Sequence, residues 1–182
     1  MLSLAGFSDR IPKEDVAIRN ALDEALSRHD KYPIAVSGMT IFPYELWERR
    51  GCPPWEDFHA LCVERFFPRL KACNPRNRLG TYFERMMNFT GQQGKEARTV
   101  DQLGFIIGLL KNSQRWPRQS ALQLSCFDPA KDHTGQAVRG FPCLQQVGLS
   151  HDGKNRIALH AFYPTQYVFD RGYGNYLGLC HL

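Results

Sequence analysis

The dipeptide Pro142-Cys143 places a thiol at the start of a strand-like run, directly behind a proline. A cysteine thiolate is a strong nucleophile and supports covalent catalysis. An arginine close to such a cysteine stabilises the thiolate, and Arg118, Arg139 and Arg171 are the candidates for that neighbour. The alternative is a thiol that only packs, because free cysteine is among the most buried residue types.

Two histidines suggest a different use of the same thiol. His160 lies on the strand-like run that adjoins the one beginning at Cys143, and His151 lies at the turn between the two runs. A Cys143–His160 pair would define a Cys/His hydrolase. No third residue with a recognisable orienting signature accompanies the pair, and such signatures do not transfer between families.

The elements that position these residues are expected to be a mixture of helices and strands. Apolar periodicity predicts helices over residues 13–29, 53–73 and 99–112, with a kink or break at Pro68 and Thr99 as a cap. Strands are predicted over residues 32–43, 118–129, 143–150 and 156–164, and the last two are joined by a hairpin turn at Asp152-Gly153. Residues 130–139 are a polar loop, and residues 173–182 begin an apolar helix or buried segment.

The order of these features resembles the thymidylate synthase family, which includes the pyrimidine hydroxymethylases. The helix "DQLGFIIGLLKN" is followed by the arginine-containing turn "SQRWPRQ", a strand ending "CFDP", the step "FPC", a hairpin, and "YVF" with an asparagine beyond. The resemblance extends from residue 79 to residue 182, and residues 1–78 are divergent. It implies an α/β (α+β) fold, a thymidylate synthase-like mixed β-sheet packed with helices, in one domain over residues 1–182.

The resemblance also implies roles for individual residues. Cys143 matches the nucleophile, either Gln145 or Gln146 matches the glutamine that follows it, and Asn175 matches the asparagine that reads the pyrimidine. The segment "GTYFERMMNF" contributes Tyr82 and Arg85 from an upstream motif. The substrate-binding set is then Asn175, Gln145, Gln146, Arg118, Arg171 and Tyr82. Arg85, Arg115 and Arg118 are each interpreted as a surface charge or, alternatively, as a phosphate ligand.

The function implied is transfer of a one-carbon group to C5 of a pyrimidine nucleotide through a covalent cysteine adduct, as a methyltransferase or hydroxymethyltransferase. The thiolate adds to C6 and makes C5 nucleophilic. The resemblance alone implies 5,10-methylenetetrahydrofolate as the donor and a homodimer. The amide of Asn175 favours uracil, although a flipped amide favours cytosine.

Several positions depart from the family pattern. Pro164 and Thr165 stand where the family has its phosphate-binding Arg-Ser pair, Tyr167 replaces an aspartate, and Arg171 replaces a glycine. The family also continues for a further third beyond the point that corresponds to Leu182, so the chain is interpreted as a truncated or shortened relative. A catalytically inactive nucleotide- or partner-binding protein is therefore the alternative function.

Composition sets the remaining expectations. The 182 residues are 43% hydrophobic and 23% charged, with a net charge of +5 that suits an anionic ligand. The N-terminus lacks the features of a signal peptide and no apolar run is long enough to span a bilayer, so a cytoplasmic protein with no membrane contact is expected. The six cysteines show no zinc spacing and are expected to be free thiols. A module that stacks nucleic-acid bases remains an alternative, but the basic residues are dispersed and the aromatic residues follow apolar patterns.

Overall fold

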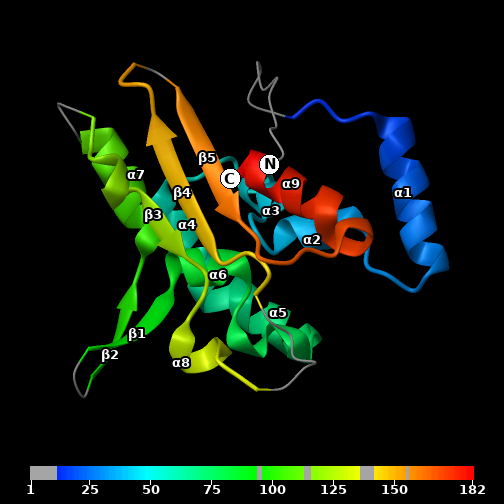
Figure 1. Cartoon of the computed structure of the whole chain (residues 1–182), viewed down its shortest axis with the longest axis horizontal. Helices are drawn as coiled ribbons and strands as arrows, with labels where there is room; N and C mark the ends of the chain where they lie inside the picture. Colours follow the sequence, from blue (N-terminus) through cyan, green and yellow to red (C-terminus); the bar gives the residue numbers. More distant parts are fainter. Residues whose placement is uncertain (1–11, 94–95, 113–115, 136–141, 155) are drawn as a thin grey trace. The chain divides into compact units, whose positions relative to one another are not determined.

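The computed structural model describes residues 12–93, 96–112, 116–135, 142–154 and 156–182. The chain divides into two compact units, one formed by Met1–Gly51 with Gln166–Leu182 and the other by Cys52–Thr165. Within the described residues, helices predominate and the strands form two small antiparallel sheets (Figure 1). This arrangement confirms the prediction of a mixed α+β fold.

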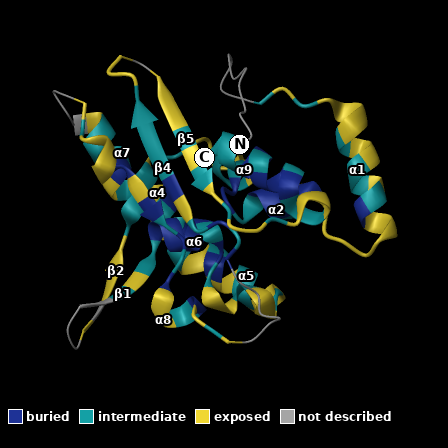
Figure 2. Cartoon of the chain, viewed as in Figure 1, coloured by how far each residue is buried: buried dark blue, intermediate teal, exposed yellow. Residues whose placement is uncertain are grey.

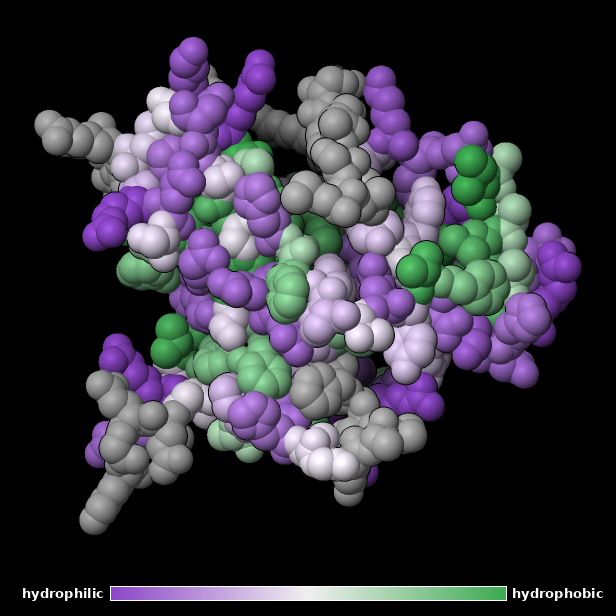
Figure 3. Space-filling model, in the orientation of Figure 1, coloured by the Kyte–Doolittle hydropathy of each residue, from purple (hydrophilic) through white to green (hydrophobic). Residues whose placement is uncertain are grey.

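The first unit is helical in its described part. Its elements are α1 (Val16–Arg28), α2 (Ile34–Met39), α3 (Tyr44–Arg49), the π-helix η4 (Val168–Gly172) and α9 (Tyr173–His181). The predicted helix over 13–29 is confirmed, and it begins after Asp15, whose carboxylate accepts hydrogen bonds from the backbone N–H groups of Ala17 and Ile18. The predicted apolar helix near the end of the chain is also confirmed as α9. Hydrophobic side chains gather over α1 in Figure 3, and Val16 is 68% exposed there.

The strand predicted over residues 32–43 is wrong, because this segment contains α2. Pro33 precedes the first turn of α2, and Gly38 lies where a Cβ atom would be only 3.2 Å from the backbone oxygen of Gly174 in α9. The missing side chains at Gly38 and Gly178 allow α2 and α9 to pack backbone against backbone. The buried face of α2 consists of Ile34, Ser37 and Gly38, whose spacing of three to four residues is that of a helix.

The second unit begins with a long helical stretch that leads to the candidate site. It comprises α4 (Trp55–Leu61), the π-helix η1 (Cys62–Phe66), α5 (Phe67–Cys73), the 3₁₀ helix η2 (Pro75–Leu79) and α6 (Tyr82–Met87). The predicted break near Pro68 is confirmed, because the π-helix η1 separates α4 from α5 and ends at Phe66, two residues before this proline. Proline has no N–H group to donate, and one π-helical turn accommodates the missing bond.

A hairpin and a further helix follow α6. Strands β1 (Phe89–Gln93) and β2 (Glu96–Val100) pair antiparallel, and α7 spans Gln102–Asn112. Thr99 was predicted to cap this helix, but it lies in β2 opposite Thr90. Asp101 takes the capping role instead, because its carboxylate accepts a hydrogen bond of 2.8 Å from the backbone N–H of Gly104.

The larger sheet has the order β3 (Gln123–Ser125), β4 (Gln146–His151) and β5 (Ile157–Phe162), with antiparallel neighbours. The 3₁₀ helix η3 (Gln119–Ala121) precedes β3, and α8 (Pro129–Asp132) follows it. The predicted β4–β5 hairpin is confirmed, and Gly153 has a φ angle of 72° at its turn. Part of the segment predicted as a polar loop is α8, because Asp128 caps a helical turn that starts at Pro129.

The core of the second unit lies where α6 meets this sheet (Figure 2). The largest fully buried apolar side chains of this unit come from α4, α6, α7, β3, β4 and the residues just before these two strands: Phe58, Phe83, Met86, Met87, Ile106, Leu122, Leu124, Leu144 and Val147. The core therefore fixes α6 against the segment that carries Cys143.

Candidate functional site

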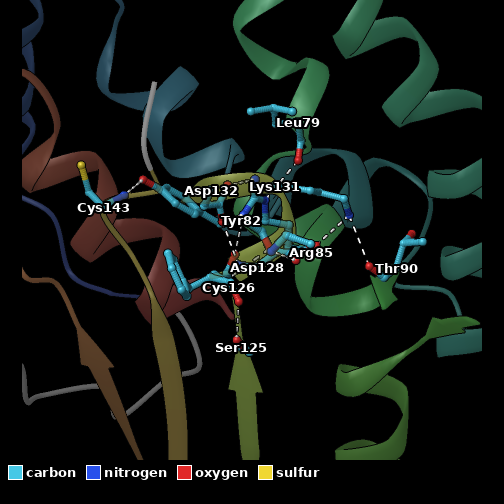
Figure 4. Close-up of polar contacts among 12 residues, drawn as sticks. Leu79, Tyr82, Arg85, Thr90, Ser125, Cys126, Asp128, Lys131, Asp132 and Cys143 are labelled. Atoms are coloured by element: carbon cyan, nitrogen blue, oxygen red, sulfur yellow. Dashed lines mark hydrogen bonds and ion pairs between the residues drawn. The ribbon is translucent and has the colours of Figure 1, made fainter. Parts of the chain in front are cut away.

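Two residues that the sequence resemblance singled out meet at the start of β4. Tyr82 is the first residue of α6, and Cys143 lies three residues before β4. The backbone N–H of Cys143 donates a hydrogen bond of 3.1 Å to the Tyr82 hydroxyl, across 61 positions of the sequence (Figure 4). The side chain of Thr81 caps α6 by accepting a bond of 3.2 Å from the backbone N–H of Glu84, so helix capping sets the position of the phenol.

The Tyr82 hydroxyl stays protonated at neutral pH. Burial raises its pKa, and the neighbouring thiol of Cys143 raises it further, while backbone N–H groups of Leu144 and Cys143 act in the opposite direction. The thiol of Cys126 adds a smaller increase, and the pKa of Tyr82 reaches about 12. The hydroxyl thus accepts from the backbone and keeps a proton that it can donate beside Cys143.

Cys143 differs from the other cysteine near this site. Cys143 is partly exposed, whereas Cys126 is completely buried, with its sulfur 4.0 Å from the backbone oxygen of Tyr82. Burial raises the pKa of the Cys126 thiol to about 12, which leaves it uncharged at neutral pH. In Figure 4 the Cys143 sulfur points away from the polar cluster around Arg85. Only the thiolate form of a cysteine is a nucleophile, so of the two thiols Cys143 is the one suited to covalent chemistry.

A buried ion pair between Arg85 and Asp132 connects the elements around the site. The guanidinium of Arg85 binds the carboxylate of Asp132 with both of its terminal nitrogens, one of them at 2.9 Å. It also donates to the backbone oxygens of Cys126 at 2.7 Å and Leu79 at 3.1 Å. Arg85 therefore ties α6 to the end of β3 and to α8. The interpretation of Arg85 as a surface charge is wrong, because the residue is buried and paired with Asp132. Its alternative role as a phosphate ligand stays a prediction.

The carboxylate of Asp132 is held in its charged form. Burial acts to raise the pKa of Asp132, but hydrogen bonds from Arg85 and from the backbone N–H of Asp128 act against it. The charges of Arg85 and Lys131 add to that effect, so the pKa lies below its usual value. The sequence signal that could have identified this pair is the Asp-Pro helix start at Asp128, which places Asp132 one turn later.

The other predicted residues of this unit do not gather around Cys143. The backbone oxygen of Gln145 accepts bonds from the N–H groups of Cys126 and Phe127, so Gln145 continues the sheet ladder next to the thiol. The side chain of Gln146 donates to Gln123 at 3.0 Å on the outer face of the sheet. Arg118 is exposed at the start of η3. Arg115 and Arg139 lie outside the described residues.

Asn175 and Arg171 belong to the first unit. Asn175 is buried in α9. Arg171 is half-buried, donates to the Ser37 hydroxyl at 3.3 Å, and lies 5.7 Å above the ring of Tyr32. The positive charge of Arg171 is thus held by partners within its own unit.

The histidines are engaged elsewhere on the sheet. The ring of His160 is bonded at 2.8 Å to the Ser150 hydroxyl rather than to Cys143. His151 bonds to the backbone oxygen of Pro117 at 2.8 Å and stacks on Trp116. The arrangement therefore does not support a Cys143–His160 hydrolase.

All six cysteines are free thiols, as predicted. In the described ranges no group of three or more histidine, cysteine, aspartate or glutamate side chains could hold a metal ion. No helix within those ranges is long and apolar enough to cross a membrane.

Comparisons with protein-family models, with curated proteins and with solved structures find no match for this chain.

Proposed function

We propose that this chain transfers a one-carbon group to C5 of a pyrimidine nucleotide through a covalent adduct on Cys143. The observation that carries this proposal is the contact between the Cys143 backbone and the Tyr82 hydroxyl. It joins two residues that the resemblance to the thymidylate synthase family takes from separate motifs, and it leaves a partly exposed thiol beside a protonated phenol.

The chemistry follows from these groups. The Cys143 thiolate forms a bond from its sulfur to C6, and the electron pair of the C5–C6 double bond moves toward the oxygen on C4. A positioned hydrogen-bond donor stabilises that developing charge, and the Tyr82 hydroxyl is available as a donor near the thiol. C5 would then attack the methylene carbon of the one-carbon donor, and loss of the C5 proton and of the donor amine would leave an exocyclic methylene group on the ring. Addition of a hydride from the reduced folate (methyl product) or of water (hydroxymethyl product) to that group would expel the Cys143 thiolate and restore the C5–C6 double bond. The donor proposed, 5,10-methylenetetrahydrofolate, comes from the resemblance alone. Neither of the two cavities described in this unit is lined by Cys143, so we assign no residue to the donor.

The test is an intact-mass measurement after incubation with a 5-fluoropyrimidine deoxynucleotide and 5,10-methylenetetrahydrofolate. Fluorine cannot leave C5 as a cation, so a working site traps a covalent adduct. We expect the adduct in the wild type and in Cys73→Ser, which changes an exposed cysteine. We expect no adduct in Cys143→Ser. An adduct of equal yield in folded Cys143→Ser would remove Cys143 from the mechanism.

The base preference tests Asn175 separately. Replacing its amide with a carboxyl in Asn175→Asp substitutes an acceptor for a donor, so we expect a shift from uracil toward cytosine. Competition between the two 5-fluoropyrimidine deoxynucleotides measures this shift. Because Asn175 is buried in α9, circular dichroism must show an intact helix first. An unchanged ratio in a folded variant would exclude Asn175 from base recognition.

One observation favours a second candidate, a relative that binds a nucleotide or a partner without catalysis. Arg171 could replace the missing phosphate arginine, but its guanidinium already lies over Tyr32 and bonds to Ser37. If the folded wild type forms no adduct, binding of the nucleotide without chemistry becomes the leading function. Equilibrium dialysis with a radiolabelled deoxynucleotide distinguishes that function from a loss of binding.

We also propose that the chain forms a homodimer through the outer face of the larger sheet. Gln123, Gln146, His160 and Phe162 line a depression there, and Phe162 is 58% exposed. None of these side chains is an aspartate, glutamate, lysine or arginine, and interface cores are depleted of charged residues. We expect Phe162→Arg to be monomeric by light scattering. Ile157→Arg, an exposed change on the opposite face of β5, is expected to remain dimeric.

A further inference from the structure

A cavity of about 300 Å³ lies within the second unit, away from Cys143. It is open to solvent on one side and is lined by residues from α5, η2, α6, β1, α8 and the segments between them. The residues that matter for its chemistry are Lys71, Leu79, Glu84, Phe89, Asp128 and Lys131. Its size is at the lower end of the range for small-molecule sites.

The walls carry charges of both signs in two pairs. The ammonium of Lys71 binds the carboxylate of Glu84, and the ammonium of Lys131 lies 3.0 Å from the carboxylate of Asp128. The side chains of the two acids are only 11% and 8% exposed, whereas those of the two lysines are 38% and 39% exposed. The carboxylates therefore form the inner wall, and the ammonium groups lie nearer to solvent.

The remaining lining completes a site for an organic molecule. Leu79 and Phe89 provide apolar surface. The ammonium of Lys131 lies 6.0 Å from the centre of the Phe89 ring and 3.4 Å from the backbone oxygen of Thr90. A carboxylate, a backbone oxygen and an aromatic face thus surround the ammonium of Lys131, so a ligand ammonium would share the carboxylate of Asp128 with this lysine. Each lysine also has N–H donors beyond the one that its carboxylate accepts.

We propose that this cavity binds a small zwitterion, an α-amino acid with an apolar side chain. Its ammonium group pairs with Asp128 and Glu84, its carboxylate pairs with Lys131 and Lys71, and its side chain contacts Leu79 and Phe89. A simple anion would face two buried carboxylates, and a simple cation would face two ammonium groups. The wall charges are already paired with one another, and a molecule that carries both charges can join these two ion pairs while every charge keeps a partner of opposite sign.

This site goes beyond the proposed function and does not depend on it. The Arg85 guanidinium also lines the cavity, but four of its five N–H donors are directed to Asp132, Cys126 and Leu79. Figure 4 shows that the contacts run from Cys143 through Tyr82 and the Arg85 cluster to Lys131 and Thr90 at the other end. The cavity and the thiol are thus at opposite ends of one network.

The test is isothermal titration calorimetry of the full chain with matched ligands. L-leucine supplies both charges, 4-methylpentanoate only the carboxylate, and 3-methylbutylamine only the ammonium group. We expect L-leucine or another apolar amino acid to bind with a dissociation constant at or below about 1 mM, and each single-charge analogue to bind at least about ten-fold more weakly.

Two variants assign the binding to this cavity. Lys131→Met keeps the apolar stem and removes the ammonium group, and we expect it to weaken amino-acid binding at least about ten-fold. Lys154→Met, an exposed change in the β4–β5 turn, is expected to bind like the wild type. The proposal is overturned if no standard amino acid binds, if 4-methylpentanoate binds as tightly as L-leucine, or if folded Lys131→Met retains full affinity. Formation of the fluoropyrimidine adduct on Cys143 is scored separately, so failure of one site does not count against the other.

Discussion

The buried pair of Arg85 and Asp132 provides the sharpest test of how α6 is held against the sheet. Side-chain exposure is 8% for Arg85 and 1% for Asp132, so neither charge is solvated by bulk water. In Asp132→Asn the shape of the side chain is kept, but the guanidinium loses its charged partner. Breaking a buried pair by removing one partner costs about 3–5 kcal/mol, which is a large share of the roughly 5–15 kcal/mol that stabilises a typical protein.

Urea unfolding followed by far-UV circular dichroism measures this loss. The matched control is Glu45→Gln, which breaks the exposed pair of Arg49 and Glu45 on α3 and is expected to cost under about 0.5 kcal/mol. The double variant Arg85→Met/Asp132→Asn is expected to lose less than the sum of its single variants, because it leaves no unpaired buried charge. A loss below about 1 kcal/mol in Asp132→Asn, similar to that of a surface pair, would refute the argument that this pair anchors α6.

The pH dependence of unfolding provides a second reading of the same variant. The pKa of Asp132 is lower in the folded chain than its ordinary value of 3.8. A group with a depressed pKa contributes stability that is present above its unfolded pKa and is lost as the pH falls through its folded pKa. We therefore expect the difference between wild type and Asp132→Asn to be constant above about pH 5 and to shrink below pH 3.8. If the difference in unfolding free energy between wild type and Asp132→Asn were equally large at low pH, the charge of the Asp132 carboxylate would not contribute to stability.

Three further outcomes follow from individual contacts. Tyr82→Phe should destabilise the chain by about 1–3 kcal/mol, because the backbone N–H of Cys143 loses its acceptor. In the wild type, the free energy of unfolding should also fall as the pH rises from about 10 through about 12, because the Tyr82 hydroxyl ionises more easily in the unfolded chain. The variant lacks this hydroxyl and should show no such fall. Gly178→Ala should destabilise by about 1–3 kcal/mol, since its Cβ would lie 2.6 Å from a backbone oxygen of α2. Gly108→Ala, which meets nothing within 4 Å, should stabilise α7 by up to about 1 kcal/mol, and equal effects would contradict the packing argument. Iodoacetamide at neutral pH should modify exposed Cys52 well before buried Cys126, and peptide mass mapping that shows early labelling of Cys126 would contradict its burial.

Local patterns were sufficient for several elements. The helix α1, the disruption before Pro68, the β4–β5 hairpin and α9 were all predicted from periodicity and from turn residues. These features depend on interactions between residues close in the sequence. Proline interrupts a helix because it lacks an N–H group, and glycine permits a turn because it adopts positive φ angles. Each of these effects is the same in many folds.

The errors occur where distant segments decide the structure. Residues 32–43 were predicted as a strand bounded by Pro33 and Pro43, but the close contact of Gly38 in α2 with α9 favours a helix. Thr99 has a suitable side chain for a cap, but its pairing with Thr90 in β2 leaves that role to Asp101. In both cases a contact between separate segments outweighs a local preference.

The candidate site shows the same division. The resemblance to the thymidylate synthase family selected Cys143 and Tyr82 as candidates, the thiol directly after Pro142 and the tyrosine in a separate upstream motif. Their contact, the raised pKa of Tyr82 and the burial of Arg85 against Asp132 depend on the packing of α6 across the end of the sheet. Burial removes water from these groups, and only the folded chain determines which charges and hydrogen bonds replace it.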